Sequence, residues 1–213
     1  MYADDILLLA PSVVALQELL HVLENVLCEL DLSINTKKSV CTRIGPRCRS
    51  ECCDIVSING NTLQWVDTVR YLGIYFVRAR LFKCNFDNAK ISFYRAFNAV
   101  FGRLGRSASE DIVLHLVNMK CLPCLLYGLD ACPLTKSDVR SLEYTCNRVL
   151  MKIFQTRSLD VIHECRRYFN VFNMKDLVDR RKAKFLNKFS ASESVVCHVF
   201  SERAKAEYVL LNK

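Results

Sequence analysis

The sequence lacks the features that carry a chain into or across a membrane. No uninterrupted apolar stretch approaches the ~18 residues of a membrane span. The first five residues include two aspartates, where a secretory signal would carry basic residues. We therefore expect a protein that is not secreted, contacts no membrane and stays inside the cell, in the nucleus or the cytoplasm. Because 51% of its 213 residues are hydrophobic, it can bury the core of one large domain or two small ones.

Histidine is also scarce, which limits the chemistry that the sequence predicts. His21, His115, His163 and His198 are dispersed along the chain, and no Ser/His/Asp or Cys/His arrangement is recognisable. Residues 47–54 hold three cysteines but no histidine at metal-site spacing, so a zinc site there would need a ligand from a distant segment.

The chain does contain twelve cysteines. Because they are scattered through apolar stretches without a secretory signal, we expect buried reduced thiols rather than a disulfide framework. Cys121 and Cys124 have the spacing of a redox pair, which makes a thiol oxidoreductase one alternative function. Such pairs usually open a helix after a strand, whereas this pair follows a helical pattern. Reduction of a test disulfide no faster than by a free dithiol would exclude this alternative.

Positive charge is concentrated in one part of the chain. Residues 1–77 have 6 Lys and Arg against 9 Asp and Glu, a net charge of −3, whereas residues 78–213 have 24 against 13, a net charge of +11. Basic surfaces attract phosphate backbones through counterion release. A non-catalytic basic helical module that binds nucleic acid is therefore a second alternative function. Ordinary solvated helix faces would explain the same charge.

The first eighty residues predict an α+β unit. Apolar residues recur every three or four positions over residues 13–30 after the N-cap Ser12, which predicts a helix. The expected core stripe is Val13, Leu16, Leu19, Leu20, Leu23, Val26, Leu27 and Leu30. Glu18, Glu24 and Glu29 are expected off this stripe.

Short strands are expected after this helix. Residues 32–44 read as two β-prone pieces around a turn with two lysines. Residues 55–66 predict a hairpin through Asn59-Gly60. Residues 69–76 read as one further strand in which Gly73 marks a bulge or a close backbone approach. From residue 81 the period is helical, with helices expected over 86–104, 109–123, 137–154, 159–169, 174–189 and 192–211.

Two adjacent carboxylates stand at the start of the chain. Residues 2–5 read Tyr-Ala-Asp-Asp and run into the apolar residues 6–10. Paired carboxylates can hold a hard divalent cation such as Mg²⁺ for displacement chemistry at phosphorus. Taken alone, Asp4 and Asp5 are equally explained as solubilising the terminus or capping a helix.

The order of several motifs resembles the reverse transcriptase of non-LTR (LINE-type) retrotransposons. Residues 2–5 resemble the metal-binding motif of that family, and the following helix with residues 32–39 (Leu-Ser-Ile-Asn-Thr-Lys-Lys-Ser) resembles its palm helix and lysine-bearing turn. Residues 69–73 (Val-Arg-Tyr-Leu-Gly) resemble the primer grip. Residues 123–130 (Pro-Cys-Leu-Leu-Tyr-Gly-Leu-Asp) resemble a segment of the helical region after the palm.

The resemblance implies a fold and a function. Residues 1–80 would be a palm remnant, a small antiparallel sheet with one packed helix, and residues 81–213 a helical thumb-like region. The full-length parent enzyme would carry out RNA-directed DNA polymerisation in retrotransposition. The partners would be an RNA template and a DNA primer, or their hybrid duplex. Nothing in the sequence sets the oligomeric state.

The resemblance also implies roles for single residues. Asp4 and Asp5 would be catalytic ligands of Mg²⁺ or Mn²⁺, and Lys38 would neutralise or protonate the departing pyrophosphate. Tyr71, Leu72 and Gly73 would position the primer end. A solvated turn lysine and ordinary strand packing are the alternatives for Lys38 and Tyr71. The cations expected to contact nucleic acid are Arg103, Arg106, Arg166, Arg167, Arg180, Arg181 and Lys182.

The sequence departs from the family in what precedes these motifs. The catalytic site of the family needs a further aspartate on an earlier strand, and the family's fingers region binds nucleotide and template. We recognise neither this aspartate nor the fingers region in the sequence, and we recognise no endonuclease. We therefore expect weak or absent metal binding and no polymerisation by this chain alone. Residues 6–10 would lack a strand partner. A truncated copy, an incomplete gene model or a repurposed fragment would each give such a sequence.

Overall fold

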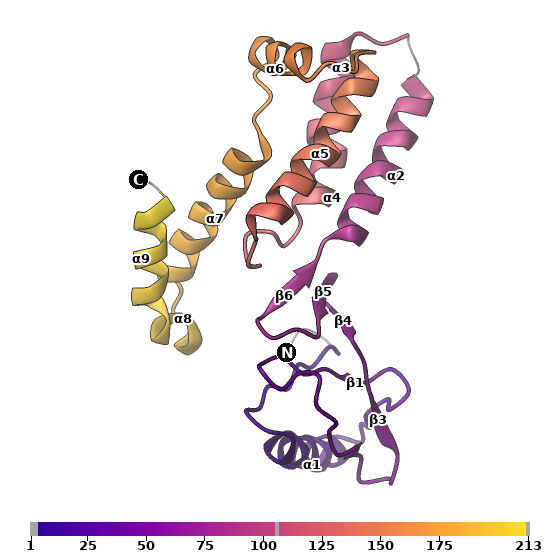
Figure 1. Cartoon of the computed structure of the whole chain (residues 1–213). Coiled ribbons are helices and arrows are strands. Elements are labelled where there is room, and N and C mark those ends of the chain that lie inside the picture. Colours follow the sequence, from indigo (N-terminus) through magenta and orange to yellow (C-terminus); the bar gives the residue numbers. More distant parts are fainter. Residues whose placement is uncertain (1–3, 105–106, 212–213) are drawn as a thin grey trace. The chain divides into compact units, whose positions relative to one another are not determined.

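The chain folds into two compact units, residues 1–85 and 86–213. The computed structural model describes residues 4–104 and 107–211. The first unit holds one helix and two three-stranded sheets, and the second is built from helices (Figure 1). The α+β class is confirmed. The division falls after residue 85 rather than 80, because residues 83–85 form a strand of the first unit.

Helix α1 (Val13–Glu29) starts where predicted. The hydroxyl of Ser12 accepts a hydrogen bond from the amide of Ala15 at 3.1 Å, which confirms it as the N-cap. The core of the unit consists of Leu20, Cys41, Ile55 and Leu63. Leu8, Val13, Leu16, Ile34 and Trp65 pack around it and are partly buried.

The buried stripe of α1 is narrower than predicted. Leu19, Val26 and Leu30 are exposed, so their assignment to the core is wrong. Glu24, expected off the stripe, is buried. The strands that α1 covers are only two to four residues long, which leaves too little sheet surface for a wide stripe.

Two polar side chains of α1 bind the edge of the first hairpin. The Glu24 carboxylate accepts hydrogen bonds from the Ser57 hydroxyl and, at 3.0 Å, from the amide of Ile58. The Gln17 side chain accepts from the amide of Val56 at 2.8 Å and donates to its carbonyl at 2.6 Å. Residues seven apart share a helix face. These two side chains therefore satisfy an edge that a further strand would otherwise pair.

Loss of the Glu24 carboxylate should destabilise the first unit. In Glu24→Ala the buried Ser57 hydroxyl and the Ile58 amide lose their acceptor, at a cost of about 1–3 kcal/mol. Urea unfolding followed by Trp65 fluorescence measures the change. The control is Glu18→Ala, an exposed glutamate of the same helix, where we expect a change below about 0.5 kcal/mol. Equal urea midpoints for the two variants would contradict the structural role of Glu24.

The first sheet has the strand order β1-β3-β2. Strands β2 (Ile55–Val56) and β3 (Thr62–Trp65) form the predicted antiparallel hairpin, and Gly60 has the positive φ of +76° that its turn requires. Strand β1 (Val40–Cys41) pairs with β3 in parallel, so the prediction of an antiparallel sheet is wrong for this pair. Residues 32–35 form no strand.

The second sheet is an antiparallel meander of β4 (Thr68–Tyr71), β5 (Ile74–Val77) and β6 (Lys83–Asn85). The single strand predicted over residues 69–76 is wrong, because the chain reverses at residues 72–73. The helical pattern predicted from residue 81 is also wrong at its start, since residues 83–85 pair with β5.

The second unit begins with α2 (Asp87–Leu104) and a continuous helical segment made of α3 (Glu110–Leu116), η1 (Val117–Cys121) and α4 (Leu122–Leu126). The prediction that this segment ends at Pro123 is wrong. Residues 117–121 form a wider π-helical turn, and Pro123 lies at the start of α4. A proline is tolerated there because the first turn of a helix does not need its N–H.

Three of the later helices start at, or one residue from, their predicted starts, and each follows a polar cap. Helices α5 (Lys136–Ile153), α6 (Leu159–Tyr168) and α7 (Met174–Ser190) follow Thr135, Ser158 and Asn173, whose side chains each accept a hydrogen bond from a backbone amide of the first turn. No helix in the described part of the chain is long and apolar enough to cross a bilayer.

The last predicted helix is two helices. Residues 192–211 were expected as one, but α8 (Val195–Val199) ends at Phe200, and α9 (Ser201–Leu211) follows. Figure 1 shows α9 lying beside α7, and the two helices contact each other.

Candidate nucleic-acid interface

The two aspartates are exposed and lie outside any helix. Asp4 is in a turn and Asp5 forms an isolated β-bridge. Residues 6–10 belong to no helix or strand, and their side chains alternate in exposure: Leu8 packs on the core, whereas Leu7 and Leu9 are exposed. The fold therefore presents both carboxylates to solvent just before this segment.

Asp4 and Asp5 are not joined by a third metal-ligating side chain among the described residues. Carboxylate oxygens are the ligands that Mg²⁺ prefers. However, within residues 4–104 and 107–211 no three His, Cys, Asp or Glu side chains converge as metal ligands. No catalytic step is therefore assigned to a metal on this chain alone.

Lys38 lies in a turn organised by Asn35. Its backbone amide donates to the Asn35 carbonyl at 3.0 Å and approaches the Asn35 side-chain oxygen at 3.3 Å. Such Asx turns fix the backbone without using the side chain of the third residue on. Lys38 is exposed, so its ammonium group is held out in solvent.

The Tyr-Leu-Gly segment forms the tip of the β4–β5 hairpin. Tyr71 pairs with Ile74, and the two turn residues have positive φ, +47° for Leu72 and +80° for Gly73. Such a turn favours Asn-Gly, and a non-glycine residue at positive φ is strained by about 1–3 kcal/mol. Strain of this kind is often retained at functional sites, which makes the tip a candidate contact. The ring of Tyr71 packs near Phe76, at 6.5 Å between centroids.

Replacement of the strained leucine should stabilise the hairpin. In Leu72→Asn the turn gains a residue that accepts positive φ, and we expect the free energy of unfolding to rise by about 0.5–1 kcal/mol. The matched control is Leu72→Val, a β-branched residue for which positive φ is worse, and it should lower stability. Thermal unfolding of both variants measures the effect. A lower melting temperature for Leu72→Asn than for Leu72→Val would contradict it.

Arg166 was predicted to contact nucleic acid, but most of its guanidinium is bonded to groups of the chain itself. Its side chain is only 8% exposed and is used within the fold. The guanidinium forms an ion pair with Glu143 at 2.6 Å and donates to the Asn147 side chain at 2.8 Å and to the Phe172 carbonyl at 3.2 Å. These bonds join α5, α6 and the segment before α7.

Most of the other predicted cations also have partners. Arg106 lies outside the described residues, and Arg103 is exposed with no ion-pair partner among them. The remaining contacts are Arg167 with Glu164 at 3.1 Å, Arg180 over the Phe172 ring at 3.9 Å, Arg181 with Asp130 at 3.8 Å, and Lys182 with Glu207. Runs of basic residues in the sequence therefore did not show which cations lack a partner in the fold.

A regular spacing of exposed cations on α5 indicates unpaired positive charge more clearly. Lys136, Arg140, Tyr144 and Arg148 follow one another at intervals of four, and all are exposed. The three cations have no ion-pair partner among the described residues. Residues four apart lie on one helix face about 5–6 Å from each other. We call these four residues the α5 stripe.

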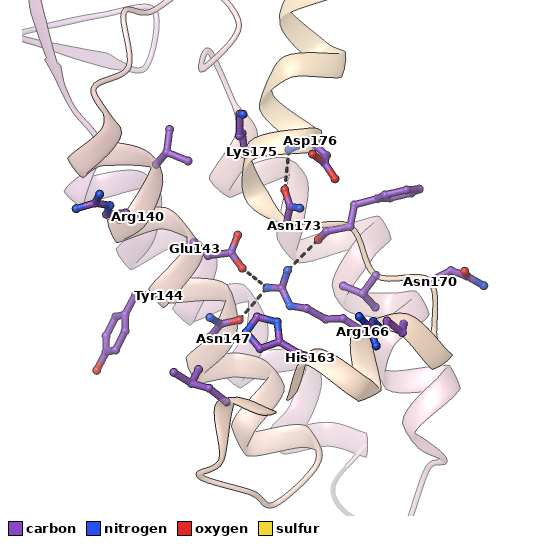
Figure 2. Close-up of a pocket in the computed structure, with 15 residues that line it drawn as sticks. Arg140, Glu143, Tyr144, Asn147, His163, Arg166, Asn170, Asn173, Lys175 and Asp176 are labelled. Carbon is purple, nitrogen blue, oxygen red and sulfur yellow. Dashed lines mark hydrogen bonds and ion pairs between the residues drawn. The ribbon is translucent and has the colours of Figure 1, made fainter. Parts of the chain in front are cut away.

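A hollow of about 850 Å³ lies beside the α5 stripe, between α5, α6 and the start of α7. Figure 2 shows the guanidinium of Arg166 among the residues that line it, with its bonds to Glu143, Asn147 and the backbone before α7. The Glu143 carboxylate also accepts from the amide of Met174 at 2.5 Å. The Nε of Arg166 is buried and has no hydrogen-bond partner among residues 4–104 and 107–211.

Cys121 of the Cys121–Cys124 pair lacks the properties of a reactive thiol. The pair lies within the continuous helical segment, and Cys121 is 0% exposed. Burial raises the pKa of Cys121, and the neighbouring Cys124 raises it further. Attacking thiols of oxidoreductases instead have lowered pKa values and partial exposure.

Thiol alkylation should separate the exposed cysteines from the buried ones. At about pH 8, Cys28 and Cys53 should react more than tenfold faster than Cys121 and Cys146, because the thiolate is the reacting form. Burial raises the pKa of Cys146 to about 12, with the Glu143 carboxylate adding to the rise and Arg166 opposing it. Mass spectrometry of peptides measures the rates. Equal labelling of all four cysteines would contradict this burial.

The same pKa shift makes stability depend on pH. The unfolded thiol loses its proton near the ordinary value of 9.0, whereas the native Cys146 keeps it to about 12. This group's contribution to stability is therefore complete below pH 9.0 and is lost as the pH rises toward 12.

Comparison of the chain with known protein-family models, curated proteins and solved structures finds no match. The function of the chain is therefore inferred from its own residues: the order of the motifs, the strained hairpin tip and the distribution of charge.

Proposed function

We propose that this chain is the palm-and-thumb part of a LINE-type reverse transcriptase and that, alone, it binds nucleic acid without polymerising it. The observation that carries this proposal is the division of charge between the two units. Residues 86–213 have 21 Lys and Arg against 13 Asp and Glu, a net charge of +8, whereas residues 1–85 have 9 against 9, a net charge of zero. The whole net charge of the chain thus lies on the helical unit.

Much of this charge is available to an external anion. In the helical unit the exposed cations without an ion-pair, hydrogen-bond or ring partner among the described residues are Arg95, Arg103, Lys120, Lys136, Arg140, Arg148, Arg157, Lys175, Lys184, Lys188 and Arg203. Free cations on rigid helices suit the phosphate backbone of a duplex or a single strand, whose affinity does not depend on sequence.

The order of the motifs supports the polymerase parentage. Asp4 and Asp5 are exposed just before residues 6–10, Lys38 is held out by a turn, and Leu72 is strained at a hairpin tip. In the polymerase, Asp4 and Asp5 would supply two of the metal-holding carboxylates, and a further carboxylate has to come from outside the described residues. Lys38 would neutralise the leaving pyrophosphate.

Primer extension with and without metal tests both halves of the proposal. The purified chain is incubated with a primed RNA template and deoxynucleotides, in Mg²⁺, in Mn²⁺ or in a chelator. We expect the same affinity for the primed template in all three conditions and no extension in any of them. Extension of the primer would contradict the lack of polymerase activity. Binding that disappears in the chelator would contradict charge as its source.

The double variant Asp4→Asn and Asp5→Asn is the control for the aspartates. Because the two carboxylates lie in the neutral unit, their removal should leave the affinity for nucleic acid unchanged. A several-fold loss of affinity would show that these residues are part of the binding surface.

A further inference from the structure

We propose that the hollow between α5, α6 and the start of α7, together with the α5 stripe, is a site for single-stranded nucleic acid that takes one nucleotide into the hollow. This inference rests on the proposed nucleic-acid binding and specifies the strand type and the surface.

The hollow contains a donor that needs an acceptor. The Arg166 side chain is only 8% exposed. Its Nη1 and Nη2 atoms are bonded to the Phe172 carbonyl, the Asn147 side chain and the Glu143 carboxylate. Only its Nε has no partner within the described part of the molecule. A buried N–H without an acceptor is costly. Because this atom has almost no accessible surface, a phosphate or base oxygen in the hollow would satisfy it after a small shift of the Arg166 side chain.

The hollow is also of suitable size and charge. Its volume of about 850 Å³ lies within the range of pockets that hold small ligands. Arg140 and Lys175 border it, and both are exposed without an ion-pair partner among the described residues. The two acids that line it are Glu143, which is already bonded to Arg166 and to the amide of Met174, and the exposed Asp176. An anionic group is thus the favoured occupant.

Aromatic rings at the hollow favour a nucleic acid over an acidic peptide. The ring of Tyr144 is 62% exposed in the middle of the α5 stripe, with Arg140 and Arg148 one turn away on either side. Phe172, in the segment before α7, also lines the hollow, and the Arg180 guanidinium lies over its ring, 3.9 Å from the centroid. Bases of single strands stack on such rings, whereas paired bases of a duplex cannot. Figure 2 shows Tyr144 and Arg140 projecting from the same side of α5, away from Arg166.

The spacing of the α5 stripe suits a single strand. Its cations at positions 136, 140 and 148 stand at multiples of four residues, about 6 Å of helix axis for each interval. This interval is close to the separation of successive phosphates in an extended strand. A strand that follows α5 would therefore place phosphates at the cations and a base at Tyr144.

Two variants that should leave the fold unchanged test the contributions of stacking and of charge separately. All substituted side chains are exposed, so the variants should fold. Tyr144→Ala should weaken binding of a short single-stranded RNA about tenfold without changing its salt dependence, because stacking is not ionic. Arg140→Gln with Lys175→Gln should instead reduce the slope of log affinity against log salt by about 1–2. Tyr144→Ala should change the affinity for a blunt duplex by less than about twofold, because paired bases do not stack on the ring.

The measurements use the full chain and fluorescence anisotropy, with Lys188→Gln as a matched surface control outside the hollow. Equal losses for single strand and duplex, or no loss with Tyr144→Ala, would overturn this site while leaving the proposed function intact. Absence of binding to either form would overturn the proposed function itself. Displacement of the RNA by an equally charged polyglutamate at the same concentration would show that the site takes any polyanion, contrary to the proposal.

Discussion

Replacement of Arg166 by alanine is expected to lower the free energy of unfolding by about 2–4 kcal/mol, whereas the same replacement at its neighbour Arg167 should change it by less than about 0.5 kcal/mol. The two arginines are adjacent in the sequence and were indistinguishable there. The structure separates them completely, because Arg166 is 8% exposed and Arg167 is 81% exposed.

The difference follows from what each side chain leaves behind. Without Arg166, the Glu143 carboxylate, only 27% exposed, loses its cation, and the Asn147 side chain and Phe172 carbonyl lose a donor. An unpaired, largely buried charge is one of the few sources of large destabilisation. Arg167 pairs with Glu164 at the surface, where both groups remain solvated.

Urea unfolding followed by far-ultraviolet circular dichroism measures the loss. Arg166→Met keeps the aliphatic stem and should lose nearly as much as Arg166→Ala, because the charge rather than the packing is at issue. Adding Glu143→Leu to Arg166→Met should restore part of the stability. It should not restore all of it, because Glu143 also accepts from the amide of Met174. Equal midpoints for the Arg166 and Arg167 variants would contradict this network.

Raising the salt concentration should weaken nucleic-acid binding steeply. If about four phosphates are contacted, the affinity for a duplex should fall roughly 100-fold between about 50 mM and 200 mM monovalent salt. The net charge of +8 on residues 86–213 makes such a number of contacts reasonable. A metal-dependent site of a few specific contacts would show a much flatter dependence.

Paired and unpaired cations should contribute differently to this slope. Neutralising Arg95 and Arg103, which are exposed on α2 without ion-pair partners among the described residues, should reduce the slope by up to about 2. Neutralising Arg167 and Lys205, which pair with Glu164 and Glu202, should change it by less than about 1. Anisotropy titrations over a salt series measure the slopes. The reverse order would contradict our distinction between free and engaged charge.

Local patterns predicted where helices and turns lie better than they predicted which face of each element is buried. The helix caps Ser12, Thr135, Ser158 and Asn173 and the Asn59-Gly60 turn act through neighbouring residues, so the sequence shows them directly. The break at Phe200 and the reversal at residues 72–73 were missed. In the second case the signal was a leucine, which is unusual at positive φ, rather than the Asn-Gly that marks such turns.

Burial was harder to predict, because it depends on partners distant in sequence. Glu24 is buried because Ser57 and Ile58 donate to its carboxylate, and no residue close to position 24 in the sequence indicates those donors. Arg166 is buried because Glu143, Asn147 and the Phe172 carbonyl meet it from other segments. The α5 stripe, by contrast, follows from a period of four, and it could have been found from the sequence.

The most direct test of our central claim is the affinity of the intact chain for an RNA–DNA hybrid in the presence of a chelator. At about 50 mM salt we predict saturable binding with a Kd in the low micromolar range or tighter, since non-specific binding reaches roughly 10⁻⁴–10⁻⁶ M even at higher, physiological salt. The absence of saturation at a protein concentration of about 100 µM under these conditions would contradict a nucleic-acid-binding role for the helical unit.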